Sequence, residues 1–316
     1  MNTIMVPLDG SPLADRVLPY VQLLAPVLRA RVHLIRAISA TEHDRLLMRS
    51  ALVEARAGAI VPPVCVACAM ADICQGTECA IAQQAACLRA SGVEAYADTR
   101  VGTATAVIAT TAEQSPDTLI AMATHGHTGL RRWALGSTAD TLLHTTSIPL
   151  FLVRGDRFAP SPNSAIRRIL VPLDGSELAR QALPIAIELA ICARAELILL
   201  QVTAESVEDY LHAFPVAANV RQLLYDQIDR AAGVLADNLT QQPVQVSTAI
   251  AVGPTAQTIA EEAEHRHADL IVMATHGYTG IKRWRFGSIA DQVLHATTTP
   301  LLLVRAQRQA YQADTD

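Results

Sequence analysis

The stretch VPLDGS at Val6–Ser11 occurs a second time, letter for letter, at Val171–Ser176. A longer stretch, Met122–Arg154, recurs as Met273–Arg305 with 21 of 33 positions identical. The first pair is offset by 165 residues and the second by 151, so the first copy carries about 14 extra residues between its two blocks. A repeat of this length indicates one domain that is duplicated within the chain.

The repeat divides the 316 residues into two domains, as their number also suggests. We expect a first domain at residues 1–154, with the extra residues inside 39–75, and a second at residues 166–307. Residues 155–165, rich in Gly, Pro, Ser and Asn, are typical of a linker, and residues 308–316 form a tail.

Each copy begins with a short apolar run that predicts a buried strand, Ile4–Leu8 in the first copy. Ser11 and Pro12 then form a helix-start signal, a capping residue followed by proline. Pro19 and its counterpart Pro184 interrupt this helix, which predicts a kink shared by both copies.

Strands continue to alternate with helices along the rest of each copy. In the first copy we expect further strands at Val32–Ala37 (matched by Leu197–Val202), Glu94–Arg100, Thr118–Ala123 and Pro149–Val153. We expect helices at Glu78–Ala90, at Thr103–Glu113 and from Ser137. This alternation predicts right-handed crossovers and a tandem pair of doubly wound α/β domains. Each has a five-stranded, mostly parallel sheet with helices on both faces. Such folds bind ligands at the carboxyl ends of their strands.

Composition excludes several classes of function. A formal charge of −5 and a pI near 6.1 provide no basic surface for nucleic acid. The most apolar long stretch, residues 181–202, contains Glu188, Arg194 and Glu196, which argues against a membrane span. The N-terminus lacks the pattern of a signal peptide, so we expect a cytoplasmic protein.

Five of the six cysteines lie between Cys65 and Cys87. Only Cys65 and Cys68 have a spacing that suits zinc, and a zinc ribbon would need a second close pair. We therefore expect no metal site, reduced thiols, and cysteines that serve as small buried apolar residues.

A glycine-containing loop joins a strand to a helix in both copies. Met122–Gly126 (MATHG) is followed by nine residues and then Gly136–Thr138, and Met273–Gly277 is followed by nine residues and then Gly287–Ile289. Glycine lets backbone approach a ligand closely, and a helix N-terminus offers free N–H groups and a positive dipole end. The loop therefore predicts a phosphate site, where the serine after the last glycine either donates to phosphate or caps the helix.

This pattern resembles the signature of the universal stress protein family, and the resemblance covers nearly all of both halves. It implies an adenine nucleotide alpha hydrolase-like fold. In ATP-binding members the loop holds the phosphates, an Asp after the first strand holds the ribose, and the first two strands line the adenine pocket. For this chain the resemblance implies ATP, AMP or ADP, with or without Mg²⁺, as the ligand. The implied site residues are Pro7, Leu8, Asp9, Ala37, Met122, Ala123, His125, Gly126, Gly136, Ser137, Thr138, Pro172, Leu173, Asp174, Val202, Met273, Ala274, His276, Gly277, Gly287, Ser288 and Ile289.

The chain departs from the signature at its first glycine, which is Ala123 in one copy and Ala274 in the other. Alanine is compatible with nucleotide if this position has an ordinary β conformation. If the backbone must touch the ligand there, the added methyl lowers affinity.

Several of these residues also have purely structural interpretations. Asp9 and Asp174 can serve as helix-capping acids, and His125 and His276 can simply form hydrogen bonds within the loop. The basic residues of the loop can neutralise phosphate or remain solvated charges; they are Arg131, Arg132, Lys282 and Arg283.

The motifs favour binding over catalysis. The sequence has no Walker lysine, no carboxylate cluster for Mg²⁺ in phosphoryl transfer and no Gly-x-Ser-x-Gly elbow, so we assign no catalytic residues. Three hypotheses follow: a nucleotide-binding stress-response or signalling module, a nucleotide-independent dimerising scaffold, or a slow ATPase.

The last strand of each copy is apolar, Pro149–Val153 and Pro300–Val304. Members of the family pair two domains antiparallel through this strand. The resemblance therefore implies a pseudo-dimer of the two domains within the chain, with homodimerisation of the whole chain as a further option.

Overall fold

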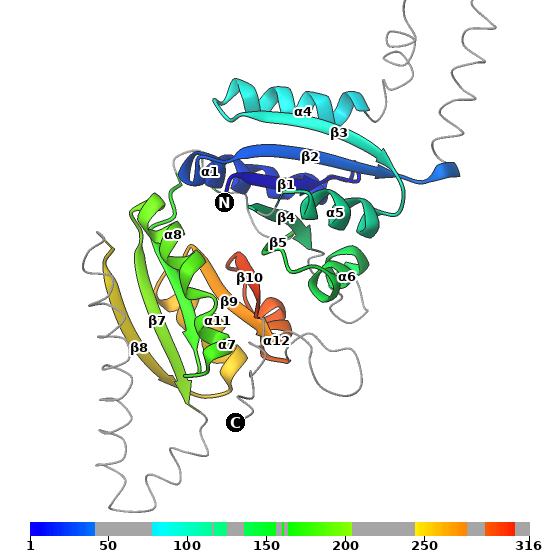
Figure 1. Cartoon of the computed structure of the whole chain (residues 1–316). Helices are drawn as coiled ribbons and strands as arrows, with labels where there is room; N and C mark the ends of the chain where they lie inside the picture. The colour runs from blue at the N-terminus through cyan, green and yellow to red at the C-terminus, as the bar shows by residue number, and fades with distance from the viewer. Residues whose placement is uncertain are drawn as a thin grey trace, which may run out of the picture. The chain divides into compact units, whose positions relative to one another are not determined.

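The computed structural model describes residues 1–41, 78–115, 117–124, 136–155, 160, 164–203, 244–276 and 288–306. The chain forms two compact units (Figure 1). The first consists mainly of Met1–Ile148, and the second of Pro149–Arg157 and Ser161–Asp316. Most of the expected insertion (42–75) and the tail (308–316) lie outside the described residues.

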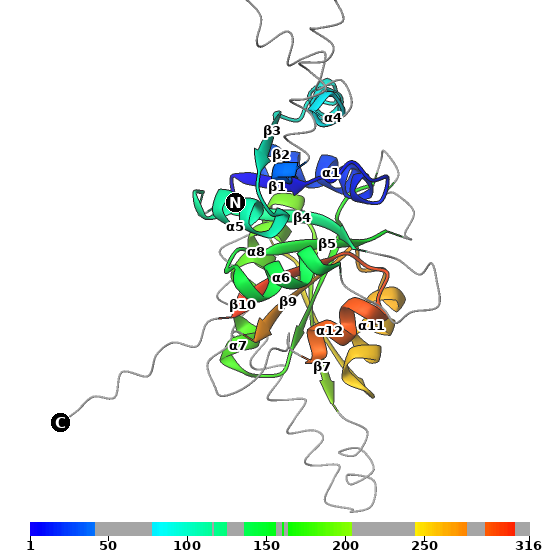
Figure 2. The ribbon, with the colours of Figure 1, turned by 90° about the vertical axis from the view of Figure 1, so that its right-hand side faces the viewer.

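Unit 1 is a parallel sheet with helices on both faces. Its elements are β1 (Thr3–Pro7), the 3-10 helix η1 (Ala14–Val17), α1 (Leu18–Leu28), β2 (Arg31–Ile38), α4 (Glu78–Ala90), β3 (Ala95–Val101), α5 (Ala104–Glu113), β4 (Thr118–Thr124) and α6 (Ser137–Thr145). The strand order is β3-β2-β1-β4, and the strands run parallel. Figure 2 shows α1 and α4 on one side of these strands and α5 on the other.

Unit 2 has the same design, but among the described residues it has six strands and unit 1 has four, instead of the predicted five in each. Its elements are β5 (Leu150–Arg154), β6 (Arg168–Leu173), α7 (Glu177–Arg180), α8 (Leu183–Ala193), β7 (Glu196–Thr203), β8 (Val246–Val252), α11 (Thr255–His265), β9 (Leu270–His276), α12 (Ser288–Ala296) and β10 (Leu301–Ala306). The strand order is β5-β10-β9-β6-β7-β8. All neighbours are parallel except β5 and β10, which are antiparallel with Phe151 opposite Leu302.

These sheets confirm the predicted doubly wound, mostly parallel α/β fold. Strands covered on both faces must be apolar along their whole length, which explains runs such as Leu119–Met122. Ile4, Val6 and Ile120 have no exposed surface, and the described core is mainly aliphatic, with Tyr20 and Phe151 as buried aromatic residues. The final strand of the first repeat, β5, belongs to unit 2, so the division into units falls before this strand.

The expected kinked helix after the first strand is two separate segments. In the first repeat η1 ends at Val17, and α1 then begins with Pro19 in its first turn. In the second repeat α7 ends at Arg180, and Pro184 occupies the same place in α8. Proline has no N–H to donate and its fixed φ suits a helix start, so it begins the second segment instead of bending a continuous one.

The expectation of buried cysteines is wrong for Cys87, which is exposed on α4. The buried stripe of this helix is Ile81, Ala85 and Leu88, at helical spacing, and Cys87 lies beside it. Cys65 and Cys68 lie outside the described residues. Where the chain is described, no group of His, Cys, Asp or Glu could hold a metal ion, and no helix could cross a bilayer.

Candidate functional site

The turn after the first strand of each repeat is held by its own side chains. In unit 2, Oδ1 of Asp174 accepts from the backbone N–H of Ser176 at 2.9 Å, and the Ser176 hydroxyl oxygen accepts from the N–H of Ala179 at 3.1 Å. In unit 1, Oδ1 of Asp9 likewise accepts from the N–H of Ser11 at 2.8 Å, and the Ser11 hydroxyl oxygen accepts from the N–H of Ala14 at 3.1 Å. The aspartates therefore shape the turn, and the serines satisfy N–H groups in the first turn of the helix.

The glycine between aspartate and serine has a left-handed backbone in both copies. Gly10 has φ of 82° and Gly175 has φ of 81°, a region that side chains disfavour. This conformation turns the chain sharply from strand to helix at the carboxyl end of the sheet.

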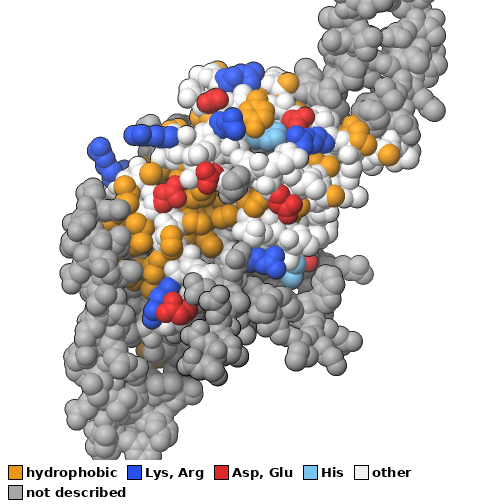
Figure 3. Space-filling model, viewed as in Figure 1, with side chains coloured by type: hydrophobic (Ala, Val, Ile, Leu, Met, Phe, Trp, Pro, Cys, Tyr) orange, Lys and Arg blue, Asp and Glu red, His pale blue; other side chains and the backbone are white. Residues whose placement is uncertain are grey.

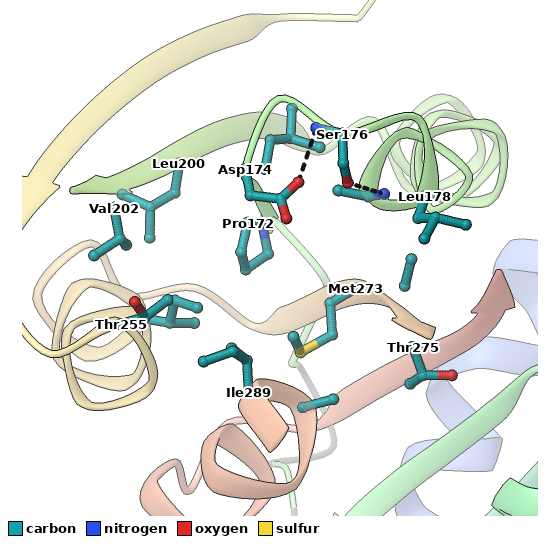
Figure 4. Close-up of a pocket in the computed structure, with 15 residues that line it drawn as sticks. Pro172, Asp174, Ser176, Leu178, Leu200, Val202, Thr255, Met273, Thr275 and Ile289 are labelled. Carbon is teal, nitrogen blue, oxygen red and sulfur yellow. Dashed lines mark hydrogen bonds between the residues drawn. The ribbon is translucent and has the colours of Figure 1, made fainter. Parts of the chain in front are cut away.

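Unit 2 contains a cavity of about 280 Å³ at the carboxyl ends of β6, β7 and β9. Figure 4 shows Asp174 and Ser176 on one side of it and Thr255 and Ile289 on the other. Its walls are mainly apolar, with the Asp174 carboxylate at the rim. Ligands bind at this end of the strands in open α/β sheets.

Seven of the residues predicted for the second copy line this cavity: Pro172, Leu173, Asp174, Val202, Met273, Ala274 and Ile289. His276 ends β9 and Ser288 begins α12, whereas Gly277 and Gly287 lie outside the described residues. Sequence reasoning missed the remaining lining residues, Ser176, Leu178, Ala179, Leu200, Thr255, Ile259, Thr275 and Ala290. The four-residue spacing of Thr255 and Ile259 puts them on one face of α11, but it does not show that this face reaches the cavity.

The corresponding residues of the first copy occupy equivalent strand ends. Pro7 ends β1, Ala37 lies near the end of β2, and Met122 lies near the end of β4. Because β1 pairs in parallel with both β2 and β4, these carboxyl ends meet at one edge of the sheet. Leu8 is buried and Asp9 is exposed beside it. His125 and Gly126 lie outside the described residues.

The alanines that replace the first signature glycine have ordinary strand backbones. Ala123 lies in β4 and Ala274 in β9, where it pairs with Val304 of β10. Neither has a positive φ. The position does not need the conformational freedom of glycine, and Ala274 itself lines the cavity.

Gly136 is the N-cap residue of α6, with φ of −53° and ψ of 140°, so its backbone is one that other residues adopt. Within the described part of the chain no side chain caps this helix, and Ser137 is its exposed first residue, with Thr138 following. Of the two roles considered for Ser137, the structure therefore does not support helix capping. The first-turn N–H groups have no side-chain acceptor among the described residues, and such groups suit an anion.

Electrostatics favour an ionised Asp9. Partial burial raises the pKa of this carboxyl, but the hydrogen bonds from Ser11 and the nearby Arg36 guanidinium lower it. The resulting pKa lies below the usual 3.8. Arg36 also packs against the turn, because a side chain at Gly10 would meet its Nη1 at 2.8 Å. The charge is retained at neutral pH.

Comparison with known proteins identifies relatives of both halves. The model of the universal stress protein family matches residues 1–154 and 165–305. Universal stress protein MJ0531 of Methanocaldococcus jannaschii is 31% identical over 143 residues, 45% of this chain and 84% of that protein. YxiE of Bacillus subtilis is 28% identical over 145 residues, 44% of this chain and 98% of its own. A universal stress protein from Archaeoglobus fulgidus shares the fold over 96% of this chain and 98% of its own, with a TM-score of 0.65 and 19% identity.

Proposed function

Because this chain belongs to the universal stress protein family, we propose that each of its repeats binds an adenine nucleotide (ATP, ADP or AMP), with or without Mg²⁺. The observation that carries the proposal is the cavity of unit 2, which combines apolar walls with one carboxylate at the strand ends. Seven of its lining residues are positions that the family resemblance assigns to nucleotide.

The chemistry of the cavity suits the parts of a nucleotide in turn. Pro172, Val202 and Met273 provide an apolar slot for a planar base. The carboxylate of Asp174 is an acceptor for ribose hydroxyls. The phosphates would lie toward the start of α12, where helix N–H groups and the glycine loop of the signature follow β9.

We infer a binding module that acts in a cytoplasmic stress response or signalling pathway, in which the bound nucleotide alters the partners of the protein. No catalytic residue is assigned, because the motifs that position a phosphoryl-transfer nucleophile or its metal are missing from the sequence.

The test begins with mass spectrometry of ligands that co-purify with the full chain. Calorimetric titration with ATP should then give up to two sites per chain. Gly277→Val or Gly287→Val should remove one site, and Gly126→Val or Gly136→Val the other, because a β-branched side chain blocks close backbone approach to phosphate. At Gly136 the effect must be steric, since its φ is negative. Protein that neither carries nor binds adenine nucleotide at millimolar concentration would disprove the proposal.

A second candidate is a dimerising scaffold that does not use nucleotide. The antiparallel pairing of β5 with β10, the last strands of the two repeats, favours it, because this pairing needs no ligand. The glycine variants distinguish the two: a scaffold would retain its protein partners in all four, whereas a nucleotide-dependent module would lose them.

A further inference from the structure

Unit 1 contains a polar cavity that the nucleotide proposal does not use. It encloses about 360 Å³ on the face of the sheet that α5 partly covers, and its lining comes from β1, β2, β3, β4 and the C-terminal end of α5. Figure 3 views this face and shows charged side chains of both signs and histidine gathered over β2 and β3.

Two buried polar atoms at the cavity have no hydrogen-bond partner among the residues that the structure describes. His33 is 5% exposed, and its Nε2 is 3.8 Å from Oδ2 of Asp98, too far for a hydrogen bond. Thr118 is 1% exposed, and its Oγ1 is likewise unpartnered. Both residues line the cavity. Leaving buried polar groups unsatisfied destabilises a fold, so such groups call for an explanation.

The imidazole of His33 is held in place by stacking. Its ring centroid lies 4.4 Å from that of Tyr96, and the planes differ by 18°. The ring is therefore fixed by an aromatic neighbour on the next strand, while its Nε2 has no hydrogen bond within the described part of the chain.

The second repeat shows that the fold does not require these side chains. In the first repeat His33 of β2 pairs with Tyr96 of β3. At the equivalent position of the second repeat, Ile198 of β7 pairs with Ser247 of β8. Asp98 and Arg100 are matched by Ala249 and Ala251. Ile198 is 3% exposed, so an aliphatic side chain packs well at the position of His33. The combination of His33, Asp98 and Arg100 therefore occurs in the first repeat alone.

The charges around the cavity favour an anion. Arg100 donates from Nε to Asp98 at 2.8 Å and from Nη1 to the hydroxyl of Thr111 at 2.9 Å. Arg31 donates from Nε to the hydroxyl of Thr3 at 3.3 Å. Two guanidinium groups thus face one carboxylate, which leaves a net positive charge beside the unpartnered groups.

We propose that this cavity is a ligand site for a small organic anion that carries a carboxylate or phosphate group. The anion accepts hydrogen bonds from the Thr118 hydroxyl, from His33 Nε2 and from the guanidinium groups, so it satisfies the two orphaned atoms at once. The site is independent of the proposed nucleotide pockets.

Binding at this site should be coupled to protonation of His33. Burial lowers the pKa of the imidazole below 6.5, with Asp98 raising it and Arg100 and Arg31 lowering it further. From α5 and the two residues after it, the cavity is faced by Thr111, Gln114 and Ser115, which are uncharged. A bound anion favours the charged imidazole, so it raises this pKa, and affinity should increase as pH falls through the raised value.

The test follows the imidazole signals of the full chain by NMR, with the signal missing in His33→Ile assigned to His33. Acetate and inorganic phosphate are titrated separately. We expect at least one to shift the His33 signal saturably and raise the pKa of His33. A response to acetate alone identifies a carboxylate ligand, and a response to phosphate alone identifies a phosphate ligand. Responses to both show that the site recognises the anionic group that the two share.

Thr118→Val separates a ligand role from a structural one. It replaces an unpartnered hydroxyl by a methyl of the same shape, so the melting temperature should not fall, while anion affinity should drop about tenfold or more. The control is Thr110→Val, the same change at an exposed position of α5 outside the cavity, and it should leave affinity unchanged. A His33 signal that neither anion shifts, or a shift that Thr118→Val does not weaken, would overturn the proposal in favour of a cavity filled by water only.

Discussion

Two methyl groups, on Ala123 and Ala274, occupy the position of the first glycine in the family signature. Because neither residue has a positive φ and both lie in strands, the methyl imposes no backbone strain. We expect Ala274→Gly to leave ATP affinity unchanged within error and to lower the free energy of unfolding by about 0.5–1 kcal/mol, the effect of glycine within a strand. Calorimetric titration and urea denaturation of the full chain measure both. A large gain in affinity would show that the methyl obstructs the ligand.

Asp174 combines a structural and a proposed ligand role, and two substitutions separate them. Asp174→Ala removes the carboxylate and the acceptor for Ser176, and should weaken ATP binding in unit 2 by about 1–3 kcal/mol. Asp174→Asn keeps an oxygen for the turn and removes only the charge, so its effect on affinity should be intermediate. If the Asp174→Asn variant binds ATP as tightly as wild type and the Asp174→Ala variant loses only stability, Asp174 forms the turn and is not a ribose ligand. The same comparison applies to Asp9.

Acid should reveal the ionised state of Asp9. Its pKa in the folded protein is below the usual 3.8, so the unfolded chain binds more protons. The carboxylate therefore stabilises the fold above pH 3.8, and this contribution is lost as pH falls through the lower folded value. Urea denaturation should show Asp9→Asn less stable than wild type at pH 7, with the difference shrinking in strong acid. A difference that stays constant with pH would contradict the assignment.

At the residue scale, the sequence predicted what a duplicated motif can reveal. VPLDGS and MATHG occur twice, so the cavity residues on β6 and β9 were identified from their own letters. Thr255 and Ile259 were missed because their contribution depends on how α11 packs against the sheet. The cluster around His33 was missed for the opposite reason: it occurs in one repeat only, and its members come together through the register of β2 and β3.

At the scale of elements, strands and helices were predictable because buried parallel strands are apolar throughout and helices carry a start signal. The helix α4 has the predicted bounds, Glu78–Ala90. Strand ends differ from the prediction by one residue, as for β1, which is Thr3–Pro7 instead of Ile4–Leu8. The helix after β1 was not predicted correctly, because periodicity continues across Pro19 while the backbone is divided there. Local pattern does not distinguish a kink from a fresh helix start.

The extra residues of the first copy should be dispensable for folding. They fall between β2, which ends at Ile38, and α4, which begins at Glu78. The entropy of closing a loop changes slowly with its length, so shortening residues 41–75 to the length of the second copy should alter the free energy of unfolding by only about 1 kcal/mol. Urea denaturation should remain a single cooperative transition. Loss of cooperativity would place the segment within a core, and stoichiometric zinc in the wild-type protein would overturn our interpretation of its cysteines.

At the scale of the whole molecule, the allocation of β5 was not apparent from the repeat. The two copies match through Arg154 and Arg305, so the sequence suggests a boundary after β5. The structure assigns β5 to unit 2, where it pairs with β10. This is the antiparallel pairing of last strands that the family resemblance implies. Sequence identity reflects duplication of the domain, whereas the division into compact units reflects which residues lie close together in space.

Each repeat expressed alone should therefore form a dimer. Residues 1–157 would leave β5 without β10, and residues 161–316 would leave β10 without β5, so each half exposes an apolar strand edge that invites pairing. In the intact chain the short linker favours pairing of β5 with β10 through high effective concentration, and separate halves lose this advantage. Light scattering coupled to size exclusion should show homodimers of each half and, after mixing, a heterodimer with the mass of the full chain. If both halves are monodisperse monomers and remain so when mixed, the last strands do not drive association.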